Sequence, residues 1–209
     1  MKTILVLFLL IPTLSWGAKL TSILEEDFFS GHGKDIEKYT LSIQVYSGPE
    51  LNDSLHLVLW PNSNETINIE QYQFTKQEPD FGYKGEKDFL CLKSTFEKAA
   101  EWVEIARKNG VENVRKEIDM CDYRRVAWPG TMSLVSFRFE TEMLDFALPT
   151  QANRLFITLF AGGVGETVEF WINESAIKRI RDVFNNLEKH FEDVRKIETK
   201  RLKDEELFQ

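Results

Sequence analysis

The fold is decided by the stretch from Thr40 to Leu59, which reads TLSIQVYSGPELNDSLHLVL. Leucine, isoleucine or valine recurs at every second position in each half of it, and the turn sequence Ser47-Gly48-Pro49 lies between the halves. A side-chain period of two is typical of a β-strand that buries one face. The stretch therefore predicts two antiparallel strands joined by a turn, with one face of their sheet in the core.

A third strand is predicted directly after this pair. Its apolar residues begin at Ile67 and change phase before Tyr72. A β-bulge produces such a slip, because it inserts one extra residue into a strand. Together the three segments predict an antiparallel meander.

A helix is predicted to follow the meander, after a polar loop over 77–87. Ser94 and Glu97 have the spacing of a capping box, in which two side chains bind exposed backbone groups at the start of a helix. Apolar residues then recur at helical spacing as far as Asn109-Gly110, where a left-handed glycine can end the helix. A second short helix is expected within 111–123.

The second half of the chain repeats this order. Three alternating runs, centred on Phe137, Ile157 and Phe170, predict three more strands. The glycine-rich segment 162–165 lies between the last two runs and is typical of a hairpin turn that needs positive φ.

A long helix is predicted to end the chain. Asn173 is suited to its N-cap, and apolar residues follow at intervals of three and four from Ile177 to Val194. We expect this helix to pack on the sheet, because the repeat is too short for a coiled coil. The charged segment from Lys196 to Gln209 is expected to be a solvent-exposed, fraying helix end.

Both halves therefore have the order strand-strand-strand-helix. A doubly wound parallel sheet is excluded, because its strands alternate with helices. We predict a single α+β domain over residues 18–209, with antiparallel sheet structure and a long C-terminal helix. The shared order is a weak indication of internal duplication.

Composition narrows the function. The chain has 209 residues, 26 Lys and Arg against 34 Asp and Glu, and a net charge of -8. With 43% hydrophobic residues it can build a core, so intrinsic disorder is not expected. Nucleic acid is not expected as a partner, because binding a polyanion requires an excess of basic residues.

The N-terminus predicts export. Lys2 precedes an apolar run from Ile4 to Leu14, and small residues at Ser15 and Gly17 place a signal-peptide cleavage site before Ala18. The alternatives are a membrane anchor or a buried core element, but the run is shorter than the ~20 residues that span a bilayer. We expect residues 1–17 to be a signal peptide, the mature chain to have no transmembrane segment, and the protein to be periplasmic or secreted.

The two cysteines are consistent with export. Cys91 and Cys121 are predicted to form one disulfide, because paired cysteines are oxidised outside the cytosol. In the chain-entropy treatment a loop of about 30 residues gives roughly 3–4 kcal/mol of stabilisation. The alternative is two buried free thiols.

Catalytic and metal-binding motifs are scarce in the sequence. Of the three histidines, His32 is expected in a surface loop and His190 on the last helix. His56 is expected on the polar phase of a strand, either solvated or in a cross-strand contact. Two cysteines and three scattered histidines do not make a zinc site, and we predict no cofactor. Acidic neighbours that share a strand face or flank the hairpin are interpreted as solvated charges rather than a glycosidase pair. These are Glu140, Glu142, Glu166 and Glu169.

Aromatic and basic residues in predicted turns are the candidate binding residues. Trp60 and Trp128 each precede a proline, and Arg124-Arg125 lies just before the second of these turns. Tryptophan and arginine on loops are frequent anchors of protein partners and can stack on sugars. The alternative is that the tryptophans close the ends of the core.

We therefore predict an exported, acidic, non-enzymatic binding protein, such as an inhibitor or immunity-type protein that occludes a macromolecular partner. The partner is expected to be another protein with a basic surface, because opposite charge accelerates encounter. The alternatives are a small extracellular hydrolase or carbohydrate-active protein, and a carrier of a small apolar ligand within a curved sheet.

Overall fold

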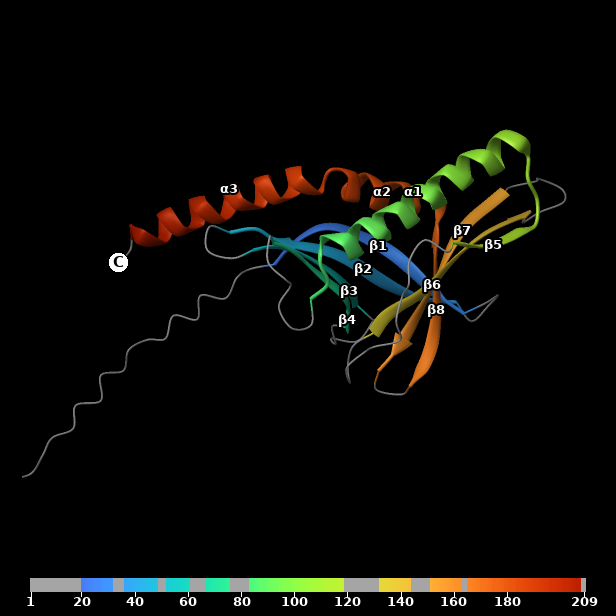
Figure 1. Ribbon diagram of the computed structural model, residues 1–209, viewed down its shortest axis with the longest axis horizontal. Helices are drawn as coiled ribbons and strands as arrows, with labels where there is room; N and C mark the ends of the chain where they lie inside the picture. Colours follow the sequence, from blue (N-terminus) through green and yellow to red (C-terminus); the bar gives the residue numbers. More distant parts are fainter. Residues whose placement is uncertain are drawn as a thin grey trace, which may run out of the picture.

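In a computed structural model of the protein, the structure describes residues 20–31, 36–48, 52–60, 67–75, 83–118, 132–143, 151–162 and 165–207. These residues form one eight-stranded antiparallel sheet and three helices, so the α+β prediction is confirmed. The helices lie together along one side of the sheet, and the last of them runs on beyond the strands (Figure 1).

The chain forms four strands, one helix, four more strands and two further helices. The first half comprises β1 (Thr21–Ser30), β2 (Glu37–Tyr46), β3 (Asp53–Trp60), β4 (Ile67–Phe74) and α1 (Glu86–Asn109). The second half comprises β5 (Val114–Ile118), β6 (Met132–Met143), β7 (Gln151–Ala161), β8 (Glu166–Asn173), α2 (Glu174–Asn185) and α3 (Leu187–Glu206).

The strand order across the sheet is β4-β3-β2-β1-β8-β7-β6-β5. Each half is a meander, but the first strand of one half meets the last strand of the other at the centre. The order β4-β3-β2-β1 of the first half therefore recurs as β8-β7-β6-β5 in the second, and a helix follows the four strands in each, as an internal duplication would give.

The predicted meander is confirmed as β2, β3 and β4. Residue Leu41 is registered against Leu59, and Val45 against Leu55, so the alternating apolar residues share one face. The predicted bulge is confirmed too, since the β3–β4 register shifts between Leu57 and Val58, leaving Ile69 as the extra residue of β4.

The strand count of the prediction was wrong by one in each half. β1 was missed because its inward positions include Glu26, a charge that breaks the apolar alternation. β5 lies where a second short helix was expected. Its sequence VRKEI carries three charges in five residues, and the strand forms by pairing with β6.

The start of α1 also differs from the prediction. The N-cap is Gly85, and the carboxylate of Asp88 accepts a hydrogen bond from the Gly85 backbone N–H at 3.2 Å. Ser94 lies within the helix, where its hydroxyl donates to the Leu90 carbonyl. The predicted end is confirmed, because Gly110 caps the helix at φ 57°.

The predicted long C-terminal helix consists of two helices. Asn173 is the N-cap of α2 as predicted, and its side chain accepts a hydrogen bond from the Ala176 N–H at 3.0 Å. The helix is interrupted at Asn186, and α3 then continues to Glu206. The expected charged end from Lys196 is therefore helical over most of its length, and Glu198 within it is buried.

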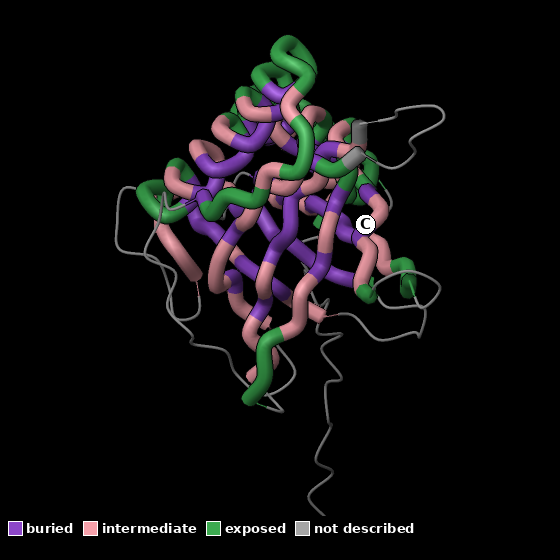
Figure 2. Tube along the Cα trace, turned by 90° about the vertical axis from the view of Figure 1, so that its right-hand side faces the viewer, coloured by how far each residue is buried: buried purple, intermediate pink, exposed green. Residues whose placement is uncertain are grey.

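The core lies between the helices and the inner face of the sheet. Exposed residues of the helices, green in Figure 2, gather on the side turned away from the strands. Phe184 of α2 packs edge-on against Phe89 and Phe96 of α1, with ring centroids 5.4 Å apart in both pairs. This aromatic cluster joins the two helices that cover the sheet.

The sheet curls so that β4 approaches β6, although the two strands are not adjacent in the strand order. The buried carboxylate of Glu70 spans this seam. It accepts hydrogen bonds from the Leu134 backbone N–H at 3.1 Å and from the Lys84 ammonium at 2.8 Å. The apolar interior beside it retains a cavity of only about 20 Å³.

The predicted signal peptide, residues 1–17, lies outside the described residues. Among those that are described, no helix combines the length and apolar character needed to cross a membrane.

Candidate functional site

The outer face of the sheet, opposite the helices, carries an unusual row of side chains. The strand registers align six residues across six neighbouring strands. In order they are Glu117, Arg138, Phe156, Trp171, Phe29 and Lys38. We call the three at its centre, Phe29, Phe156 and Trp171, the aromatic row.

The aromatic row is closely packed. The rings of Phe29 and Trp171 are stacked, with centroids 4.4 Å apart and an interplanar angle of 21°. The guanidinium of Arg154 lies 4.7 Å from the Trp171 ring centroid, and that of Arg138 lies 4.7 Å from the Phe156 ring centroid. Both distances are within the range of cation–π attraction.

Ion pairs fix the arginines in place. Arg138 donates two hydrogen bonds to the Glu169 carboxylate, at 2.7 and 2.9 Å, and a third to Glu140 at 2.7 Å. The hydrogen bonds that Arg138 donates to Glu169 raise the pKa of Arg138 above its ordinary value. Arg154 lies 3.4 Å from Glu142. These ion pairs hold the two guanidinium groups against the aromatic rings.

The sequence contained a signal for this surface that periodicity alone did not reveal. A solvated outer face normally carries polar residues, so a strand there should alternate. Alternation fails at Phe28-Phe29, at Leu155-Phe156-Ile157 and at Phe170-Trp171-Ile172. These three stretches lie on the neighbouring strands β1, β7 and β8, and only the strand order brings their outward rings together.

Among the predicted binding residues, Trp60 is described and the others are not. Trp60 ends β3, is 41% exposed and is registered against Thr40. It is therefore a surface residue rather than one that closes the core, and it is not part of the aromatic row. The remaining predicted residues, Trp128, Arg124 and Arg125, lie outside the described residues.

The predicted disulfide is described at one end only. Cys91 is half-buried in α1, and Cys121 lies outside the described residues. The pairing of these two cysteines stays a prediction.

His56 differs from the prediction. It is buried, and its Nε2 lies 3.1 Å from the Ser54 hydroxyl. Burial lowers the pKa of its imidazole. The sequence predicts a solvated or cross-strand position. The solvated alternative is wrong, because the imidazole is buried and the ring of Tyr83 packs edge-on against it. His190 is only partly buried, and His32 lies outside the described residues.

The acidic residues considered for catalysis do not form a free carboxylate pair. Glu140 and Glu169 are held by Arg138, and Glu142 lies against Arg154. The acid that burial does perturb is Glu70, which was not considered from the sequence. Desolvation raises its pKa, against the opposing effect of Lys84. Because Glu70 is fully engaged at the β4–β6 seam, it is a structural acid.

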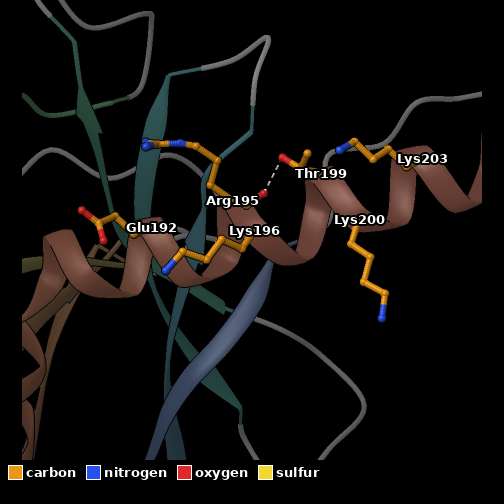
Figure 3. A pocket seen from close by; sticks show the side chains of 6 residues that line it. All are labelled: Glu192, Arg195, Lys196, Thr199, Lys200 and Lys203. Carbon is orange, nitrogen blue, oxygen red and sulfur yellow. Dashed lines mark hydrogen bonds between the residues drawn. The ribbon is translucent and has the colours of Figure 1, made fainter.

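A second feature of the surface is an open groove of about 630 Å³ along α3 (Figure 3). All its lining residues belong to that one helix, so it lacks a second wall. Arg195 points away to Asp53, with which it makes hydrogen bonds of 2.8 and 3.1 Å. The remaining lining residues are Glu192, Lys196, Thr199, Lys200 and Lys203. We assign no function to it.

No cluster of three or more metal-ligating side chains occurs within the described part of the chain. Comparisons of the chain with protein-family models, with curated protein sequences and with solved structures found no match.

Proposed function

We propose that the protein is an exported, non-enzymatic binding protein that uses the aromatic row and its flanking arginines to bind a protein partner. The observation that carries this proposal is the row itself, at the centre of the helix-free face of the sheet. Aromatic residues and arginine dominate the energetically important centres of protein interfaces. A fold that needed this face only for solvation would place short polar side chains there.

The packing of Trp171 favours a protein over a sugar. A sugar ring stacks on an open aromatic face. One side of Trp171 is occupied by Phe29 from β1, and the other side by Arg154 from β7. Phe156 is buried, so the row presents the exposed parts of Phe29 and Trp171 beside the guanidinium of Arg154. These groups suit the side chains and backbone of another protein.

The charge of the chain supports a basic partner. With a net charge of -8, the protein attracts cationic proteins over a distance of about one Debye length, near 8 Å at physiological salt. Occlusion of such a partner is the inhibitor or immunity-type role that the sequence predicts.

The alternatives have less support. A carrier of an apolar molecule needs interior space of several hundred Å³, whereas the described interior contains a cavity of about 20 Å³. A hydrolase would need a cleft that holds a perturbed acid, and the perturbed acid Glu70 is buried in a seam.

The proposal can be tested by affinity capture with tagged chain 18–209 from an extract of the source's envelope or secreted fraction. A stoichiometric protein should be retained by the wild type and by Trp60→Ala, and lost by Arg154→Ala and Trp171→Ala. Arg154→Ala removes a side chain that is 27% exposed and leaves both rings of the Phe29–Trp171 stack in place, so it separates binding from folding. Melting curves of all variants provide the control.

Two results would contradict the proposal. One is that no protein is captured at stoichiometric amounts. The other is a partner that Arg154→Ala and Trp171→Ala retain as well as the wild type does. If Trp60→Ala alone released the partner, the binding surface would be the turn predicted from the sequence and the aromatic row would have no part in it.

A further inference from the structure

The central strand β8 has a free edge. On one side it pairs with β7 along its whole length, from Arg154↔Asn173 to Ala161↔Glu166. On the other side its register with β1 consists of one pair, Phe29↔Trp171. The two strands cross there, and β8 continues past the crossing without a neighbour on that side among the described strands (Figure 1).

The backbone groups that face this edge can be identified. Backbone groups along a strand point alternately to its two sides. Trp171 faces β1, and the Glu169 carbonyl accepts a hydrogen bond from the Ser30 hydroxyl at 3.2 Å, so Glu169 faces the same way. Thr167 must then do so too.

These groups are available for pairing. Within the described residues, nothing binds the backbone N–H of Thr167 or Glu169, or the carbonyl of Thr167. Thr167 and Glu166 are exposed, and Val168 is partly exposed.

The outer edges of the sheet are protected, in contrast to this one. At β4, the Gln73 N–H donates to the Lys84 carbonyl, and the Lys84 N–H donates to the Gln71 carbonyl, both at 2.8 Å. At β5, Arg115, Lys116 and Glu117 place charges on a short strand, a feature that deters edge pairing. The edge of β8 has no equivalent cover among the described residues.

We propose that an extended segment of the protein partner pairs with the free edge of β8, beside the aromatic row. This inference rests on the proposed function and specifies how the partner binds. Unpaired strand groups are matched by the N–H and C=O groups of another strand, which is the basis of β-strand addition. The edge is continuous with Trp171, so one segment would contact both.

The charge at the edge of β8 indicates which residues the partner segment should contain. Glu166 is exposed and forms no ion pair within the described residues. A lysine or arginine of the segment is therefore expected beside it. A second copy of the chain is a poorer occupant, because edge-to-edge pairing would bring the exposed Glu166 carboxylates of both copies to one short seam, where like charges repel.

A proline at position 167 tests the proposal directly. The Thr167 N–H faces away from β7, so Thr167→Pro removes no hydrogen bond of the sheet, and proline is tolerated where the N–H of a strand faces solvent. Its ring removes the donor and blocks the edge. Thr167→Ala is the matched control, since it removes the side chain and retains the N–H.

The probe is a phage-displayed library of random peptides about a dozen residues long, selected on chain 18–209. We expect the enriched peptides to contain a basic residue, to bind wild type and Thr167→Ala equally, and to bind Thr167→Pro at least about tenfold more weakly. Equal melting temperatures of the two variants would show that both are folded. The proposal is overturned if no peptides are enriched, or if enriched peptides bind Thr167→Pro as tightly as Thr167→Ala.

Two further measurements separate the possible results. A concentration-dependent dimer that Thr167→Pro abolishes would overturn the proposal in favour of a second copy. Capture of the natural partner distinguishes this inference from the proposed function. A partner lost by Trp171→Ala and kept by Thr167→Pro would leave the aromatic row as the interface and refute strand addition. The reverse pattern would support the β8 edge and refute the aromatic row.

Discussion

Replacing Lys84 by methionine should reveal how the β4–β6 seam is held closed. Lys84 donates to the Glu70 carboxylate, whose side chain is 4% exposed, while the side chain of Lys84 is 35% exposed. Removing one partner of a fully buried ion pair costs ~3–5 kcal/mol, because the other charge is left without compensation. Since Lys84 is partly solvated, we expect Lys84→Met to lower the free energy of unfolding by about 2 kcal/mol at pH 7.

The free energy of unfolding that Lys84→Met loses should be smaller at acidic pH than at pH 7. Burial raises the pKa of Glu70 in the folded chain above its value in the unfolded chain. Between these two pKa values the Glu70 carboxyl is protonated more fully in the folded chain than in the unfolded chain, so the free energy of unfolding falls as the pH rises. Without Lys84 that pKa rises further. The variant should therefore recover much of its lost stability at pH 5, where Glu70 is more readily protonated.

Urea unfolding at pH 7 and pH 5 measures this effect. Lys98→Met is the control, because Lys98 forms an exposed pair with Glu101 and should cost less than about 0.5 kcal/mol at either pH. Glu70→Gln should remove most of the pH dependence, since its amide oxygen can still accept the Leu134 N–H. The reasoning is refuted if Lys84→Met loses the same free energy at both pH values, or loses no more than the control.

Three further predictions concern stability. His56 is buried and its pKa is lowered, so below about pH 6.5 the unfolded chain binds a proton at this residue more readily than the folded chain does. The melting temperature should therefore fall as the pH drops below this value. His56→Gln should reduce this dependence on pH more than His190→Gln does, and an equal dependence in both variants would contradict the prediction. Asn173→Ala should cost about 1 kcal/mol in urea unfolding by removing the N-cap of α2, whereas the exposed Asn185→Ala should change little. Reduction of the predicted Cys91–Cys121 disulfide should lower the melting temperature by several degrees, and an unchanged melting curve would show that no such bond stabilises the fold.

Much of the fold was predictable because its signals are local. The meander, its bulge and the glycine that ends α1 each depend on a few consecutive residues. The failures depend on distant partners. Glu26 was not recognised as an inward residue of β1, because Arg179 neutralises it from 153 positions away. β5 was not predicted as a strand because of its charged residues, and it forms because it pairs with β6.

The candidate site was less predictable, for a related reason. The pairs Phe28-Phe29 and Phe170-Trp171 are visible in the sequence as breaks in alternation. The residues around these pairs do not indicate that β1 and β8 are neighbouring strands. The sequence therefore does not predict that the outward rings of Phe29 and Trp171 are aligned. A residue in a turn, such as Trp60, can be identified from its neighbours in the sequence. A row of side chains that crosses several strands can be recognised only when the strand order is known.

The junction of the two meanders has a consequence for the order of folding. Every other neighbouring pair of strands in the sheet joins segments consecutive in the chain, and each can form early through short loops. The β1–β8 junction joins Ser30 to Glu169, which are 139 positions apart. Closing so large a loop is entropically unfavourable. The junction offsets this cost with one registered pair, the Phe29–Trp171 and Phe28–Phe170 ring contacts and the Ser30–Glu169 hydrogen bond. We expect the two meanders to fold separately and this junction to form last. The proposed binding surface would then be present in the native state and absent from any partly folded state that lacks the junction.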